Sequence, residues 1–339
     1  MLHLTKYVLT FVVGLVSAII FQLLNIPIPW LLGPIVATFV LQLFTPIELK
    51  WNGHLRDAGI ILVSLVLGGF FTADIFASIP HYIVPLLILN LVLIGFSLLL
   101  SWITAKACGI NFMTALVSSV PGGLSQLILF AEEKEAVNLP VVTYFHVVRV
   151  FLVVSLVPLI MSASATGITI ANDAPIMSLS VIILIILGYI AMQVAKLLRL
   201  PVAALLGPLI LVICLNVFQV EHAIIQVELL QLAQILVGCH IGLSLKREDL
   251  QLSKRILIMG AVSAISLIGM TMLTGYIFSK LDEISYETAF LSLAPGGLDQ
   301  MSLIALNVGG DVALVTLFQL FRILVILLIV LPIMNITIK

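Results

Sequence analysis

The sequence predicts an all-α polytopic membrane protein. We expect two inverted-topology repeats of about five transmembrane helices each, with a broken or re-entrant Pro-Gly-Gly segment in each repeat. Three observations predict this fold: the composition, a self-similarity along the chain, and the placement of the basic residues. Of 339 residues, 62% are hydrophobic and 9% charged, and the mean hydropathy is +1.30. Soluble domains carry about 25% charged residues, so lipid must be the solvent for much of this chain.

The composition also excludes several classes of protein. The net charge is -1, without a basic or acidic run, so we expect no nucleic-acid partner. The three cysteines form no Cys-x-x-Cys pair, and neither a zinc site nor a disulfide framework is indicated. Residues 7–24 could pass for a signal peptide, but the apolar run is long and no small-residue cleavage site follows. We therefore expect a retained first span, a lipid bilayer as partner, and a homo-oligomer as an open alternative.

The chain repeats itself at a shift of 174 residues. The sequence LLGP at 31–34 recurs at 205–208, and PGGL at 121–124 recurs at 295–298. A one-residue slip then aligns Arg149 with Arg322. Chance similarity between apolar stretches does not keep rare Pro, Gly and Arg positions in one register. We therefore predict a first membrane repeat over 1–161, a linker over 162–177 and a second membrane repeat over 178–339.

Each half contains six apolar segments, which are the expected membrane elements. In the first half they cover 7–24, 28–45, 58–73, 83–105, 111–131 and 139–161. In the second half they cover 178–197, 202–219, 229–245, 255–279, 286–306 and 312–334.

The basic residues outside the span centres decide between topologies, because Lys and Arg favour the cytoplasmic side. If all twelve segments cross, the split is six against seven. If the fifth segment of each half enters and leaves on one side, twelve basic residues lie together and only Lys280 lies opposite. A non-crossing sixth segment scores almost as well, but the fifth contains Pro-Gly-Gly. We therefore predict ten crossings, inverted halves and both termini in the cytoplasm of a bacterial cell, with the protein in its cytoplasmic (inner) membrane. The twelve are Lys6, Lys50, Arg56, Lys106, Lys134, Lys196, Arg199, Lys246, Arg247, Lys254, Arg255 and Lys339.

The two Pro-Gly-Gly segments are the candidate binding site. Pro and Gly break a helix, and a broken backbone inside lipid is tolerated where it is buried in protein or lines a wet cavity. The half-helix after the break would offer its N–H groups and positive dipole end to an anion. The alternative is a kink that serves packing alone. The candidate residues of the two segments are Ser118, Pro121, Gly122, Gly123, Ser125, Gln126, Ser292, Pro295, Gly296, Gly297 and Gln300.

Two arginines lie near the middle of the closing apolar segments. Arg149 falls within 139–161 and Arg322 within 312–334, where an arginine costs roughly 2.5–3.5 kcal/mol. Such a cost at equivalent positions predicts bidentate capture of a carboxylate or similar oxyanion. His146 and Gln319 lie three residues earlier and share a helix face with each arginine. The alternative is a structural ion pair, such as Arg322 with Asp299.

Asp299 breaks the symmetry of the repeat, because Ser125 stands at the equivalent position. An acid beside a broken helix can bind Na⁺ or carry a proton, so Asp299 is the candidate ion-coupling residue. A fixed counter-ion is an equally weighted alternative.

The duplicated PGGL motif, the half-length repeat and an arginine in each closing helix resemble the AbrB-duplication family of bacterial membrane proteins. The resemblance covers essentially the whole chain and implies the fold more than the function. Members are often described as ammonia monooxygenases or as regulators of another gene's expression. An oxygenase needs several metal ligands in one place, yet no two of the six histidines are three or four residues apart.

These observations favour a secondary active transporter for a small anionic or zwitterionic solute. The two PGGL segments would hold the solute, and one set of helices would move against the other. We predict no catalytic residue, no metal ligand and no cofactor, with Na⁺ or H⁺ as the coupling ion. The alternatives are a membrane metalloenzyme of the monooxygenase type and a membrane regulator that senses a solute.

Overall fold

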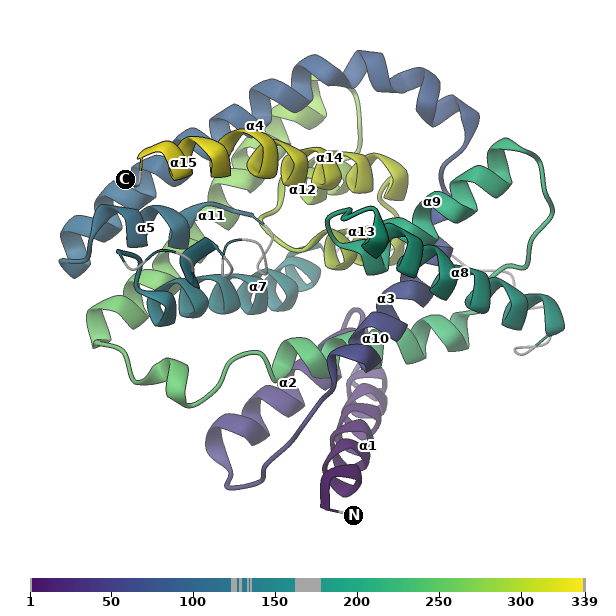
Figure 1. The fold of residues 1–339 in the computed structure, drawn as a ribbon, viewed down its shortest axis with the longest axis horizontal. Coiled ribbons are helices and arrows are strands. Elements are labelled where there is room, and N and C mark those ends of the chain that lie inside the picture. Colours follow the sequence, from purple (N-terminus) through teal and green to yellow (C-terminus); the bar gives the residue numbers. More distant parts are fainter. Residues whose placement is uncertain are drawn as a thin grey trace. The chain divides into compact units, whose positions relative to one another are not determined.

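The computed structural model describes residues 2–122, 127, 130–132, 134, 136–161 and 178–337. The predicted linker over 162–177 lies outside these residues. Every regular element in the described part of the chain is a helix (Figure 1). The prediction of an all-helical fold is therefore confirmed.

The helices follow the expected apolar segments closely. The main differences are at α3, which begins at Gly53 because Asn52 accepts a hydrogen bond from the His54 N–H, and at the 36-residue helix α4. The first half forms α1 (Leu2–Leu23), α2 (Pro29–Phe44), α3 (Gly53–Gly68), α4 (Ala73–Cys108), α5 (Phe112–Ser119) and α7 (Leu139–Met161). The second half forms α8 (Leu179–Leu197), α9 (Ala203–Val217), α10 (Val227–Gly242), η2 (Glu248–Leu250), α11 (Lys254–Leu281), α12 (Tyr286–Leu293), α13 (Leu298–Val308), α14 (Val312–Val325), η3 (Ile326–Val330) and α15 (Leu331–Thr337).

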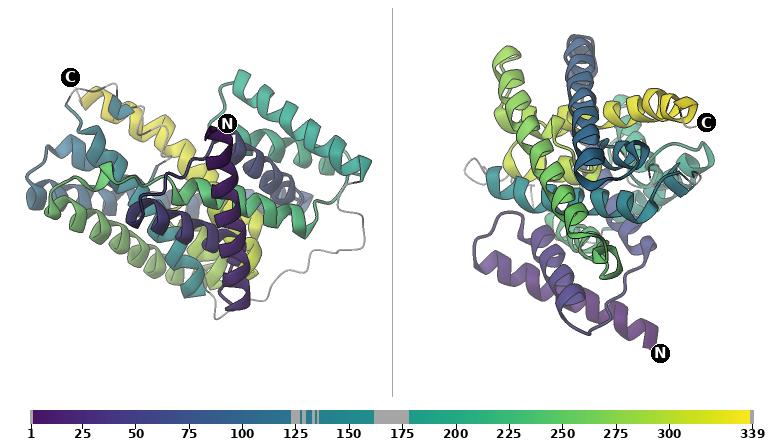
Figure 2. Two further views of the ribbon diagram at one scale, coloured as in Figure 1. Left: turned by 90° about the horizontal axis from the view of Figure 1, so that it is seen from below. Right: turned by 90° about the vertical axis from the view of Figure 1, so that its left-hand side faces the viewer.

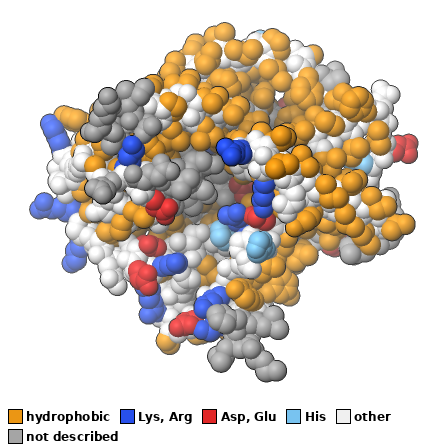
Figure 3. Space-filling view, in the orientation of Figure 1, with side chains coloured by type: hydrophobic (Ala, Val, Ile, Leu, Met, Phe, Trp, Pro, Cys, Tyr) orange, Lys and Arg blue, Asp and Glu red, His pale blue; other side chains and the backbone are white. Residues whose placement is uncertain are grey.

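Six helical stretches in the described residues are long and apolar enough to cross a membrane. Three shorter apolar helices, α2, α9 and α10, accompany them. Large apolar side chains are exposed along these helices, such as Leu91 (65%), Ile186 (53%) and Ile258 (65%). Figure 3 shows hydrophobic side chains over much of the visible face. Exposure on this scale suits a lipid solvent, because soluble monomers rarely expose large contiguous apolar patches.

The chain forms two compact units, and each unit takes helices from both halves of the sequence. The first unit contains residues 1–80, 161–244 and 302–313, and therefore α1 to α3 and α8 to α10. The second unit contains residues 81–160, 245–301 and 314–339, and therefore α5, α7, α11, α12 and most of α4 and α14.

Two glycine contacts between helices of the first unit are related by the same 174-residue shift that relates the two halves of the sequence. A Cβ atom on Gly33 of α2 would lie 2.7 Å from backbone atoms of Ser17 and Ala18 in α1. A Cβ atom on Gly207 of α9 would lie 2.5 Å from the Ala191 carbonyl oxygen in α8. Glycine thus lets each short helix approach its long neighbour at backbone distance. The two halves therefore build this packing in the same way.

The second unit is organised by the long helices α4 and α11, which run antiparallel. At one end the His81 Nε2 atom lies 3.0 Å from Asp282 Oδ1, just beyond the end of α11. At the other end the Cys108 thiol donates to the Arg255 carbonyl over 3.7 Å. The two contacts are equivalents under the 174-residue shift, and α4 and α11 lie side by side in Figure 2. Equivalent residues of the two halves therefore form the contacts at the two ends of this helix pair.

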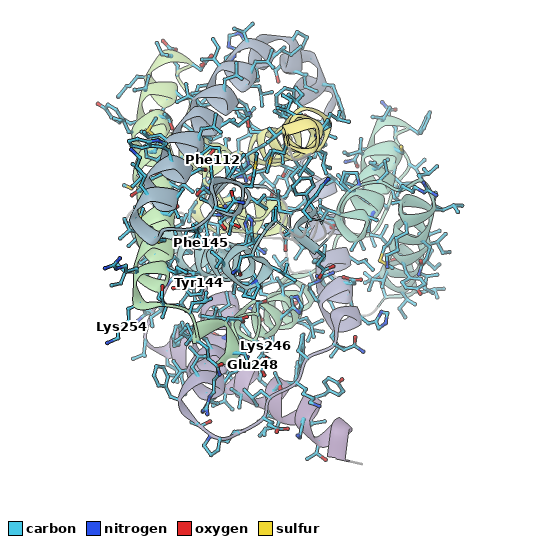
Figure 4. All side chains as sticks on the ribbon, turned by 60° about the vertical axis from the view of Figure 1, so that its left-hand side comes forward. Phe112, Tyr144, Phe145, Lys246, Glu248 and Lys254 are labelled. Carbon is cyan, nitrogen blue, oxygen red and sulfur yellow. The ribbon has the colours of Figure 1, made fainter. Side chains whose placement is uncertain are left out.

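Helix α7 is anchored to α11 by an aromatic pair. The Tyr144 hydroxyl donates to the Leu257 carbonyl over 2.8 Å, and a Cβ atom on Gly260 would lie 2.6 Å from the Tyr144 ring. Tyr144 and Phe145 lie on α7 in the region of Lys254, at the start of α11 (Figure 4). This anchor fixes the helix that carries Arg149 and His146.

The last helix contains one turn of π-helix, Ile326–Val330, after Arg322. Arg322 and Pro332 are ten residues apart, whereas their counterparts Arg149 and Pro158 are nine apart. A π turn accommodates a single inserted residue within an α-helix. The turn therefore restores the register of the repeat beyond the arginine.

Candidate functional site

The candidate site lies in the second unit, where α5 and α12 end. Side chains of Asn111 and Ser285 cap the two helices, and each helix has eight residues. Val120 and Ala294 follow in an extended conformation, ahead of Pro121 and Pro295. In both copies the first glycine N–H donates to the carbonyl two residues earlier over 2.9 Å. The two breaks therefore have the same backbone geometry, including short turns around the prolines.

Arg322 is bound by the carbonyl groups of the second break. Its Nη1 donates to the Leu293 and Ala294 carbonyls over 3.1 and 2.8 Å, and its Nη2 donates to the Gly296 carbonyl over 2.9 Å. Nη2 also donates to the Gln319 side-chain oxygen. These four bonds can employ all four terminal N–H groups of the guanidinium. The positive charge also lies at the C-terminus of α12, where a cation is favourable.

Arg149 makes fewer bonds at the first break. Its Nη1 donates to the Val120 carbonyl over 3.0 Å, and its Nη2 lies 2.8 Å from the His146 Nδ1 atom. His146 Nε2 lies 2.9 Å from the Val117 carbonyl oxygen. A guanidinium has five N–H donors, so three donors of Arg149 have no partner among the described residues.

Both guanidinium groups are buried, because each arginine is only 4% exposed. Their positive charges lie close enough to repel each other. The Nε atoms of both arginines are buried without a hydrogen-bond partner among the described residues. Neither arginine forms an ion pair with any carboxylate that the structure describes. The alternative of an Arg322–Asp299 pair is therefore not the arrangement found.

Asp299 and Gln300 lie in the first turn of α13, directly after the break. The Gly297 N–H donates to the Gln300 side-chain oxygen over 2.7 Å, which caps the helix from its third residue. The Gln300 amide donates to Asp299 over 3.4 Å. An acidic side chain here stabilises the positive end of the helix dipole. Gln300 thus caps the N-terminus of α13, and the Asp299 carboxylate lies at the positive end of the helix dipole.

The serines of the two segments differ in their hydrogen bonds. The Ser118 hydroxyl donates to the Thr114 carbonyl within α5 over 2.6 Å. Its equivalent Ser292 is 2% exposed, and its hydroxyl has no partner among the described residues. The Ser119 hydroxyl is also buried without a described partner. The hydroxyl groups of Ser292 and Ser119 are therefore available to hydrogen-bond a ligand.

The structure brings most of the predicted site residues together around the ends of α5 and α12. His146 and Gln319 are fully buried beside their arginines, at 0% exposure. Gly123, Ser125 and Gln126 lie outside the described residues. The main partners of the arginines are backbone carbonyls, which the sequence does not reveal because any residue type supplies them.

Within the part of the chain that the structure describes, no group of three or more His, Cys, Asp or Glu side chains is arranged to hold a metal ion. His146 contacts an arginine and a carbonyl, as described above.

The fold and the site define an all-helical protein of membrane-spanning type, with buried cationic side chains at two equivalent helix breaks. The chain matches the family model described as "Transition state regulatory protein AbrB" over residues 30–337, and it belongs to this AbrB family. The predicted resemblance is thereby confirmed.

Two relatives match nearly the whole chain. It is 28% identical over 331 residues to "Uncharacterized protein YhjN" of Bacillus subtilis strain 168, which covers 88% of this chain and 85% of that protein. It is 26% identical over 315 residues to "Putative regulator AbrB" of Escherichia coli K12, which covers 91% of this chain and 89% of that protein.

Proposed function

We propose that this protein is a secondary active transporter for a small anionic or zwitterionic solute in the bacterial cytoplasmic membrane. The observation that carries the proposal is the pair of buried arginines, which have no carboxylate partner among the described residues. A buried, uncompensated charge is costly, and two neighbouring like charges increase that cost. A bound anion would compensate both.

Arg149 is the principal anion-binding residue in this proposal. Its three donors without a described partner can form the charge-assisted, bidentate bonds that suit a carboxylate or similar oxyanion. Arg322 keeps one such donor, its Nε–H, and contributes mainly its charge. The Ser292 hydroxyl would add a neutral hydrogen bond, with the residues of the Pro-Gly-Gly segments forming the wall.

Inverted repeats with ten crossings belong to the same proposal. When repeats are inverted, equivalent helices run in opposite directions through the membrane. The antiparallel packing of α4 and α11 through equivalent contacts supports this arrangement. Each compact unit also contains equivalent helices from both halves, as expected for two bodies that move in alternating access.

The topology can be tested with single cysteines at Lys50→Cys and Lys246→Cys in a chain whose native cysteines are replaced. We expect a membrane-impermeant maleimide to label both positions from the cytoplasmic side only, because twelve basic residues favour that side. Lys280→Cys should be labelled from the opposite side. Labelling of positions 50 and 246 from opposite faces would rule out the inverted arrangement.

The anion site can be tested by a thermal-shift screen of the purified chain against carboxylates, amino acids and inorganic anions. A ligand that binds the folded state raises its melting temperature. We expect Arg149→Gln to weaken binding of any hit by about tenfold or more, since a hydrogen bond to a charged group contributes about 1.5–3 kcal/mol. Lys254→Gln, at the exposed start of α11, is the matched control. Equal binding by the wild type and Arg149→Gln would contradict the proposed site.

Transport itself requires flux in proteoliposomes. Saturable uptake of the bound solute that Arg149→Gln abolishes would support the carrier. Saturable binding without flux would instead favour a solute-sensing regulator, the second candidate, which agrees with the regulator name of the Escherichia coli relative. Stoichiometric copper or iron in the purified protein would favour the metalloenzyme. Asp299 remains a predicted ion-coupling residue in the carrier, with Na⁺ or H⁺ as the ion.

A further inference from the structure

His146 and Gln319 occupy equivalent positions, but only the histidine can take up a proton. Arginine has donors and no acceptor, so the His146 Nδ1 that lies 2.8 Å from Arg149 Nη2 must be the acceptor. Nε2 lies 2.9 Å from the Val117 carbonyl, which can only accept, so Nε2 carries the hydrogen. His146 is therefore a neutral imidazole in this structure.

Gln319 makes the same two types of contact without a titratable group. Its side-chain oxygen accepts from Arg322 Nη2, and its nitrogen donates to the Leu291 carbonyl over 2.7 Å. Leu291 is the counterpart of Val117 under the 174-residue shift. The second repeat thus shows that a glutamine suffices to hold the arginine, so a histidine in the first repeat adds the capacity to bind a proton.

Among the described residues, few charged or titratable groups act on the ring. Arg149 is the charge that acts directly on His146, and Arg322 on α14 acts on Arg149. Tyr144 on the same helix directs its hydroxyl to α11. Helices α5 and α15 contribute to the apolar cluster that contains Val142 of α7. They carry no titratable side chain over 112–119 and 331–337. The titratable side chains of α11 include Lys254, Arg255, Tyr276 and Lys280.

We propose that His146 binds the proton that is co-transported with the anion held by Arg149, an inference that rests on the proposed function above. An added proton occupies the Nδ1 lone pair, so the hydrogen bond from Arg149 Nη2 to that atom breaks. The imidazolium N–H and the released guanidinium N–H then both donate to the anion, whose charge compensates the new positive charge. Proton binding and anion binding therefore strengthen each other by the same factor.

The experiment compares the thermal shift caused by sodium methanesulfonate and sodium sulfate at several pH values from about 8 to about 5, the range in which histidine titrates. Both anions keep their charge in this range. For the wild type, we expect the apparent Kd to fall by about 5–150-fold between the two ends, as is typical of coupled sites. His146→Gln should give a Kd that does not change with pH. Gln319→His should add a second pH-dependent step, and His240→Gln, a histidine in the other unit, should keep the wild-type profile.

The outcomes separate this inference from the proposed function. A Kd that depends equally on pH in the wild type and His146→Gln overturns the role of His146, and loss of the dependence in Asp299→Asn would assign it to Asp299. A pH-independent Kd in the wild type overturns proton coupling but leaves the anion site intact. If neither anion shifts the wild type at any pH, and the carboxylates, amino acids and other inorganic anions of the wider screen also fail, both proposals fall. If His146→Gln does not fold, the pH step gained by Gln319→His decides.

Discussion

Arg322→Gln should lower the free energy of unfolding by about 2–6 kcal/mol, because the Leu293 and Gly296 carbonyls would lose their bonds to the guanidinium and each buried unpaired acceptor costs about 1–3 kcal/mol. The Ala294 carbonyl would keep bonds from the Gly296 N–H and the Gln319 amide, so it adds little. Such a loss is a large part of the 5–15 kcal/mol that typically stabilises a protein. The measurement is thermal unfolding of the purified variant in detergent.

Arg322→Lys should recover only part of this loss. A lysine ammonium is a point charge on a flexible stem, and it cannot reproduce the planar fork that spans Leu293, Ala294 and Gly296. Arg149→Gln should destabilise less than Arg322→Gln, because Arg149 holds one carbonyl and one imidazole nitrogen. The surface control Lys254→Gln should stay within about 0.5 kcal/mol. If Arg322→Gln were as stable as the wild type, relief of the buried charge would outweigh the lost bonds, and the hydrogen bonds of Arg322 to the carbonyls of the second break would not stabilise the fold.

The comparison of Arg322 with Arg149 shows what the sequence can and cannot predict about the site. Two arginines in equivalent apolar helices are visible in the sequence, because lipid makes a buried charge unusual. Their partners are not visible, because carbonyl groups have no residue identity. The division of roles follows from the number of bonds each guanidinium makes, and that number depends on where α12 and α5 end.

The fold was more predictable than the site, for a physical reason. Long apolar segments predict membrane-spanning helices, because the thickness of the bilayer sets their length, and the 174-residue shift locates the segments twice. Local geometry within the segments was harder to predict. The π turn at 326–330 follows from one extra residue between Arg322 and Pro332, and the sequence alone does not say whether a helix absorbs such a residue or ends there.

Gly207→Ala and Gly269→Ala should change stability in opposite directions, although the substitution is the same. A Cβ atom on Gly207 would meet the Ala191 oxygen at 2.5 Å, the Ala191 carbon at 2.6 Å and the Met192 nitrogen at 2.7 Å. These are backbone atoms of α8, so the clash is relieved only when α8 and α9 move apart. A Cβ atom on Gly269 would meet nothing within 4 Å. In thermal unfolding, we expect Gly207→Ala to lose about 1–3 kcal/mol, and Gly269→Ala to gain about 0.5–1 kcal/mol from helix propensity.

Gly33→Ala extends the same test to the first half of the chain. Its Cβ atom would lie 2.7 Å from backbone atoms of Ser17 and Ala18, the counterparts of Ala191 and Met192. We therefore expect a loss of stability similar to that of Gly207→Ala, because α2 packs on α1 through the same glycine contact by which α9 packs on α8. The two sites lie on different helix pairs, so their losses should add within about 0.3–0.5 kcal/mol in the double variant. Stabilisation by Gly33→Ala or Gly207→Ala would show that these helices do not pack at backbone distance.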